Sequence, residues 1–174
     1  MISEELLSEV INTKKTAFKA KYRKLMLGNR HYSNKISLRS DDGKFQYSLV
    51  LRKSESFIED FSVLLIWENA NEYSDVNKNI ILARYQGPHD GKEPEGVDIH
   101  HSYHTHKITS KDIEVKRYLK PSNRKETEAY NSFEQAIQCF ITDFGIVGVE
   151  NTVEPFVDNK QLPERIIIED ISNA

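Results

Sequence analysis

Four histidines fall within nine residues, in the segment IHHSYHTHK at positions 99–107. A fifth, His89, precedes them in RYQGPHDG. If the segment is a β-strand, alternate side chains share a face, so His100, His104 and His106 lie together. His104 and His106 are then about 6–7 Å apart, which is close enough for both imidazoles to reach one phosphate or one metal ion.

Metal-free cleavage of RNA is the first chemistry that fits these residues. One neutral imidazole takes the proton of the 2′-hydroxyl, a second protonates the leaving 5′-oxygen, and a cation stabilises the charge on phosphorus. The predicted catalytic residues are His104, His106, His89 and Arg84, and the predicted substrate-binding residues beside them are Lys107, Tyr85 and His100.

A metal site is the second chemistry. His104 and His106, with His89 or Asp90 as a further ligand, are residue types that hold Zn²⁺ or Mn²⁺. The carboxylates that keep this alternative open are Asp90, Glu93, Glu95 and Asp98. We favour the metal-free chemistry, with no cofactor, because the carboxylates form no compact set and the chain has a single cysteine. The histidines also fit a third interpretation, the polar face of a strand.

Charge is distributed unevenly along the chain, although the net charge is only −3. No acidic residue lies between Val10 and Ser40, whereas the stretch from Asp143 onward is mainly acidic. Basic side chains that neutralise phosphates give sequence-independent affinity for nucleic acids, although a basic run is also typical of a solvated helix face. The residues predicted to bind phosphates are Lys14, Lys15, Lys19, Lys21, Arg23 and Lys24.

The hydrophobic pattern predicts an α+β fold. Ser3 followed by two glutamates is typical of a helix start, and helical spacing of apolar residues extends this predicted N-terminal helix over about 3–27. The segments KISLRS and KFQYSLVLR flank the turn DDG as in a β-hairpin, and FSVLLIWE, NIILARYQ and the histidine segment add strands. We therefore expect an antiparallel sheet of about four to six strands within 34–109. A capped apolar stripe predicts a helix at 132–144 that covers one face of this sheet.

A chain of 174 residues is expected to form one domain over 1–174, with an acidic tail at about 150–174. No apolar run approaches the roughly 18–20 residues that span a bilayer, so no membrane partner is expected. The single Cys139 requires no oxidising compartment, and we expect a cytoplasmic protein. The sequence contains no P-loop, dinucleotide fingerprint, nucleophile elbow or CxxC motif.

The order ILARYQGPH, HHSYHTHK and EAYNSFEQAIQCFITDFGI resembles small prokaryotic domains of the TumE-like kind, found with toxin–antitoxin systems and mobile elements. In these domains a strand that ends as RYQGPH does here is followed by an H-x-H strand and a helix. The resemblance covers roughly residues 34–145 and carries over Arg84, Tyr85, His89, His104 and His106. It implies an α+β fold and a setting with an antitoxin or another protein partner.

We therefore favour a histidine-dependent, RNA-directed nuclease of toxin type, with RNA as its first partner. The alternatives are a non-enzymatic inhibitor or binding protein encoded by a phage or mobile element, and a small metalloprotein. His104 and His106 are expected on the solvent-facing side of their strand. Two such imidazoles would give a bell-shaped pH profile with limbs near the ordinary histidine pKa of about 6.5.

Overall fold

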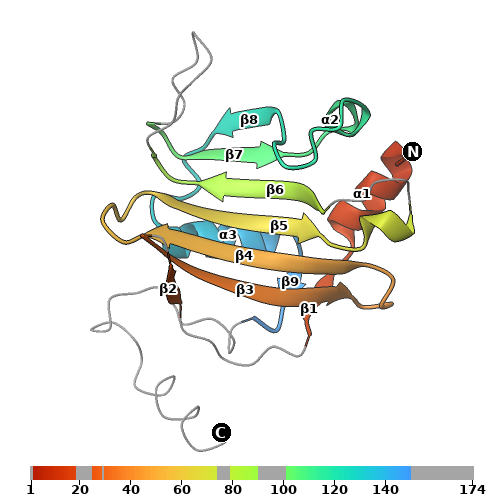
Figure 1. Cartoon of the computed structure of the whole chain (residues 1–174), viewed down its shortest axis with the longest axis horizontal. Coiled ribbons are helices and arrows are strands. Elements are labelled where there is room, and N and C mark those ends of the chain that lie inside the picture. Colours follow the sequence, from red (N-terminus) through yellow and green to blue (C-terminus); the bar gives the residue numbers. More distant parts are fainter. Residues whose placement is uncertain (1, 19–24, 29, 74–78, 90–100, 150–174) are drawn as a thin grey trace, which may run out of the picture.

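The computed structural model describes residues 2–18, 25–28, 30–73, 79–89 and 101–149. These residues form a nine-stranded mixed sheet with three short α-helices (Figure 1). The strand order is β8-β7-β6-β5-β4-β3-β1-β9, and β2 pairs separately with β3. Neighbouring strands are antiparallel except for β1 and β9, which are parallel.

The elements have the following bounds in chain order. They are α1 Glu4–Asn12, β1 Lys15–Ala17, β2 Met26–Gly28, β3 His31–Ser40, β4 Gln46–Ser54, β5 Phe61–Trp67, the 3-10 turn η1 Ala70–Glu72, β6 Ile80–Gln86, β7 His104–Lys107, α2 Ser110–Glu114, β8 Asn123–Glu126, α3 Phe133–Asp143 and β9 Ile146–Val147. No helix of the described residues is both long enough and apolar enough to cross a membrane.

The prediction of a four-to-six-stranded sheet with a long N-terminal helix over 3–27 is wrong. Helix α1 ends at Asn12, and the chain then forms β1, which pairs with β3 through Thr16 and Arg39. Thr13 and Thr16 are weak helix formers, and pairing with an exposed sheet edge overrides the apolar spacing of this stretch. The extra strands β1, β2, β8 and β9 contain only two to four residues, too few to show an alternating pattern.

The predicted hairpin is present as β3 and β4, and the predicted antiparallel meander continues through β5, β6 and β7. The DDG turn places Gly43 at a φ of 74°, in the left-handed region that glycine adopts without strain. The alternating residues of the second hairpin segment face the core, and each of them is at most 1% exposed: Phe45, Tyr47, Leu49 and Leu51.

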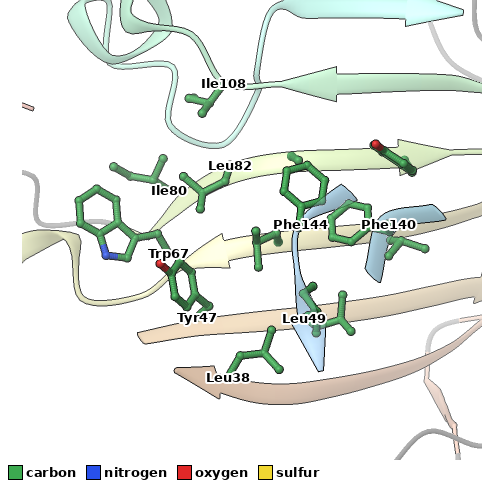
Figure 2. Close-up of a cluster of buried hydrophobic side chains, with 14 of the residues drawn as sticks. Leu38, Tyr47, Leu49, Trp67, Ile80, Leu82, Ile108, Phe140 and Phe144 are labelled. Carbon is green, nitrogen blue, oxygen red and sulfur yellow. The ribbon is translucent and has the colours of Figure 1, made fainter. Parts of the chain in front are cut away.

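Helices α1 and α3 pack on the same face of the sheet. Ser132 caps α3 by accepting a hydrogen bond from the Gln135 amide at 3.2 Å, as the sequence predicts. Phe140 of α3 and Phe144, the residue at its C-terminal cap, then pack over the strands (Figure 2). In Figure 1, α3 lies behind β4 and β5. Apolar burial therefore holds both helices on this face, and the side chains at alternate strand positions point to the opposite face.

Lys15 is a structural residue and not the exposed phosphate ligand that the basic run predicts. Its side chain is 0% exposed, and its Nζ donates hydrogen bonds to the carbonyls of Ile11 at 2.8 Å, Thr13 at 2.6 Å and Phe144 at 3.3 Å. Burial lowers the pKa of Lys15 to about 8. The ammonium thus joins the last turn of α1 to the end of α3.

We expect Lys15→Met to lower the free energy of unfolding by about 1–2 kcal/mol, because buried carbonyls lose their donor while the side-chain stem still fills its space. Urea unfolding at neutral pH measures this change. The neighbouring Lys14 is exposed and pairs with Asp41 at 3.5 Å, so Lys14→Met is the matched control and should change the free energy by under about 0.5 kcal/mol. Equal losses in both variants would contradict this structural role.

Candidate functional site

The candidate site lies on the sheet face opposite α1 and α3. In the antiparallel pair β6–β7, Arg84 stands opposite His106 and Gln86 opposite His104, so these four side chains share one face. In the pair β7–β8, Arg124 stands opposite His106. We call this surface the histidine face, and it carries Arg84, His104, His106, Arg124 and, on β4, Arg52.

The two central histidines are buried, although they were expected at the solvent-facing side of the strand. His104 is 0% exposed and His106 is 5% exposed. Their ring centroids are 5.0 Å apart, and the ring of His89 lies 5.3 Å from that of His104. The structure therefore brings the three predicted catalytic histidines together, with Arg84 opposite His106.

Each of the three imidazoles is oriented through its Nδ1 atom. Each Nδ1 lies within hydrogen-bond distance of a backbone carbonyl: that of Ser102 for His104 at 2.9 Å, Pro121 for His106 at 3.3 Å, and Gly87 for His89 at 3.0 Å. A carbonyl can only accept, so we assign the proton of each neutral ring to Nδ1. Nε2 is then the atom that accepts a proton or binds a ligand.

Helix α2 holds the carbonyl that orients His106. Thr109 caps the helix, and the Asp112 carboxylate returns a hydrogen bond by accepting from the Thr109 amide at 3.0 Å, which is a capping box. The same carboxylate accepts from the Ser122 amide at 3.1 Å, next to Pro121. Asp112 is thus a positioning residue, and it acts on His106 through the backbone of Pro121.

The site combines a cationic Arg84 with a neutral His106. Among the described residues, neither Nε of Arg84 nor Nε2 of His106 has a hydrogen-bond partner, and both atoms are buried. Burial lowers the pKa of the Arg84 guanidinium, and the like charges of Arg124 and Arg52 lower it further. Burial also lowers the pKa of His106 to about 3, with a smaller contribution from nearby cationic groups. His106 is therefore neutral at physiological pH.

Two predicted substrate-binding residues lie on the other face of the sheet. Tyr85 is buried there, and its hydroxyl donates a short hydrogen bond to the Asp143 carboxylate. Lys107 also points to that face, with Nζ 5.5 Å from the centroid of the Phe144 ring. The sheet therefore separates Tyr85 and Lys107 from the histidines.

The basic N-terminal residues are remote from the histidine face where the structure describes them. Strands β3, β4, β5 and β6 lie between β1 and β7, which is about 24 Å at the usual strand spacing. Lys14 and Lys15 are thus outside the site. The other predicted substrate-binding residues fall outside the described residues: His100, Lys19, Lys21, Arg23 and Lys24.

Arg124 and Arg52 belong to the histidine face but were not predicted from the sequence. Arg52 stands opposite Ser62, which stands opposite Gln86, so its side chain points to the same face as Arg84. Arg124 lies on β8, whose sequence NRKE has four exposed residues and no apolar alternation. Only the pairing of β8 with β7 places Arg124 beside His106.

The described part of the chain does not contain an arrangement of side chains typical of a metal site. No three histidine, cysteine or carboxylate side chains of the described residues are arranged to hold one. The guanidinium groups of Arg84 and Arg124 would also repel a divalent cation close to His106. The carboxylates of the metal alternative, Asp90, Glu93, Glu95 and Asp98, lie outside the described residues.

Comparison of the chain with protein-family models, curated proteins and solved structures finds no match. The resemblance to TumE-like domains therefore stays a prediction. The function of this protein is inferred below from the chemistry of the site alone.

Proposed function

We propose that this protein cleaves RNA by metal-free general acid–base catalysis at Arg84, His104 and His106. One observation carries the proposal: the buried Nε of Arg84, a donor, and the buried Nε2 of His106, an acceptor, both lack partners among the described residues. Buried polar groups are nearly always hydrogen-bonded. RNA supplies both missing partners, because its 2′-hydroxyl donates and the adjacent phosphate accepts.

His106 is suited to the role of general base. Its Nδ1 proton is held by the Pro121 carbonyl, so the Nε2 lone pair is available to take the 2′-hydroxyl proton. A pKa of about 3 keeps the ring unprotonated, but it also makes the ring a weak base in the free protein. A bound phosphate adds negative charge beside the ring, which raises the pKa of His106 as the substrate enters.

His104 and Arg84 complete the reaction. The negative charge of the bound phosphate favours protonation of His104. The 2′-oxygen attacks phosphorus while the P–O5′ bond breaks, and the protonated His104 gives its Nε2 proton to the leaving 5′-oxygen. Arg84 donates hydrogen bonds to a non-bridging oxygen, where negative charge increases in the transition state. The products are a 2′,3′-cyclic phosphate and a 5′-hydroxyl. The proton lost to His106 balances the one given by His104.

We expect Arg84→Gln to reduce the cleavage rate about 10²-fold, because the variant loses a charged donor to the transition state. A fluorogenic RNA oligonucleotide, assayed with chelator present, measures this rate. Arg39→Gln is the matched control, since Arg39 lies on β3 near β1 and contacts the Phe18 ring. The same oligonucleotide made of DNA should stay intact, because it lacks the attacking hydroxyl.

Wild-type protein that leaves RNA intact in this assay, or an Arg84→Gln variant that cleaves as fast as Arg39→Gln, would contradict the proposed function. Binding of RNA without cleavage would match the non-enzymatic alternative instead. The role as a toxin rests on the resemblance alone, and growth of cells after induced expression of wild type and Arg84→Gln tests it separately.

A further inference from the structure

Three arginines recur on every second strand of the histidine face. Arg52 lies on β4, Arg84 on β6 and Arg124 on β8. The pairings through His106 place Arg84 and Arg124 in one row across the sheet. Arg52 lies in the adjacent row, which also contains Gln86 and His104.

The spacing of these arginines suits a polyanion that crosses the strands. Two strand spacings separate Arg84 from Arg124, or about 10 Å between backbones, and the diagonal from Arg84 to Arg52 is about 12 Å. The positive charges are close enough that Arg52 and Arg124 both lower the pKa of Arg84. Arg52 and Arg84 form no ion pair within the described residues. Guanidinium groups that repel one another are stabilised when they bind successive phosphates.

The burial of the two histidines restricts which kind of nucleic acid can reach them. His104 and His106 are at most 5% exposed, so the scissile phosphate and its 2′-hydroxyl have to turn inward, toward the sheet, to reach the imidazoles. A single strand can turn its backbone inward in this way. In an A-form duplex, pairing and stacking fix the backbone, so this rotation costs the loss of base pairs.

We infer that the substrate is single-stranded RNA whose backbone crosses the sheet from β4 to β8, with Arg52 and Arg124 binding the phosphates on either side of the one held by Arg84. This inference rests on the proposed function, because the central phosphate is taken to be the one that is cleaved. It assigns Arg52 and Arg124 to binding and leaves the proton transfers to the histidines.

The test uses an oligonucleotide of about 12 nucleotides, within the usual range for single-strand sites, made of 2′-O-methyl RNA so that it cannot be cleaved. Fluorescence anisotropy of the full-length protein gives its affinity across a salt series. We expect the single strand to bind at least about 10-fold more tightly than the same strand annealed to its complement. Arg52→Gln and Arg124→Gln should each weaken binding about 3-fold to 10-fold and reduce the salt slope by about 1.

Lys125→Gln is the matched control. Lys125 neighbours Arg124 on β8 but points to the opposite face of the sheet, so this variant should bind the single strand like wild type. Three results would each overturn the inferred course of the RNA backbone. They are equal affinity for duplex and single strand, no binding at low salt, and equal losses of affinity in Lys125→Gln and Arg124→Gln. The probe cannot be cleaved, so this test of binding is independent of cleavage. A protein that shows the expected binding pattern but does not cleave RNA would contradict the proposed nuclease function and still support the inferred course of the RNA backbone across the arginines.

Discussion

Replacing His106 with Asn should lower the rate of RNA cleavage by a factor on the order of 10²–10⁴, because the reaction loses its general base. In the wild type the Pro121 carbonyl accepts from Nδ1 of His106. The asparagine amide can donate to the same carbonyl, so the local fold is retained. His104→Asn should give a loss of similar size, since its amide can likewise donate to the Ser102 carbonyl. The cleavage rate of a defined RNA oligonucleotide, measured with saturating enzyme, checks both variants.

The double variant gives a sharper result than either single variant. Base and acid act in one concerted proton transfer, so removing both should cost little more than removing one. His31→Asn is the control, because His31 lies on β3 with Asp60 3.9 Å away, apart from the histidine cluster. Circular dichroism and melting temperature report whether each variant is folded. Folded His104→Asn and His106→Asn variants that cleave like His31→Asn would show that the histidines only fill a buried part of the sheet.

Strands β3 to β6 could be predicted from sequence because each has seven to ten residues, enough to show either apolar alternation with a period of two or a continuous apolar run. The same period of two correctly places His104 and His106 on one face. Their burial could not be predicted in this way. It depends on the ring of His89, on the backbone near Pro121 and on β8, and a residue-by-residue pattern does not specify these tertiary contacts.

Strict use of alternation would have improved the predicted site. Tyr85 follows Arg84, and Lys107 follows His106, so in extended strands neither can share a face with its neighbour. The motif RYQGPH groups Arg84 with Tyr85 because they are adjacent in sequence. In the structure Tyr85 instead packs in the core, where its ring stacks on that of Tyr130 with centroids 5.5 Å apart.

The N-terminal stretch shows a second limit of prediction from sequence. Apolar spacing and a good N-cap correctly predict where α1 begins at Glu4, but they do not predict that it ends at Asn12. The end depends on the pairing of β1 with β3 and on the buried Lys15 ammonium. A lysine in a basic run gives no local sign that three backbone carbonyls will surround it.

The buried state of His106 predicts how stability depends on acid. Its pKa is about 3 in the folded protein, whereas an unfolded histidine has a pKa of about 6.5. Between these values the unfolded chain binds a proton that the folded protein does not, so the free energy of unfolding falls as pH falls from about 6.5 toward 3. At about pH 4 this contribution to destabilisation is expected to reach about 3 kcal/mol.

Urea unfolding of wild type and His106→Asn at about pH 7, 5.5 and 4 isolates this contribution, because carboxylate titration is common to both proteins. We expect the variant to lose about 3 kcal/mol less than wild type over this range, whatever its stability at neutral pH. Parallel losses would mean that burial does not lower the pKa of His106, and the low acid limb expected for kcat/KM would then be wrong as well. If His106 is held neutral, the acid limb of kcat/KM should lie far below the value of about 6.5 expected from sequence, because this limb reports the free protein.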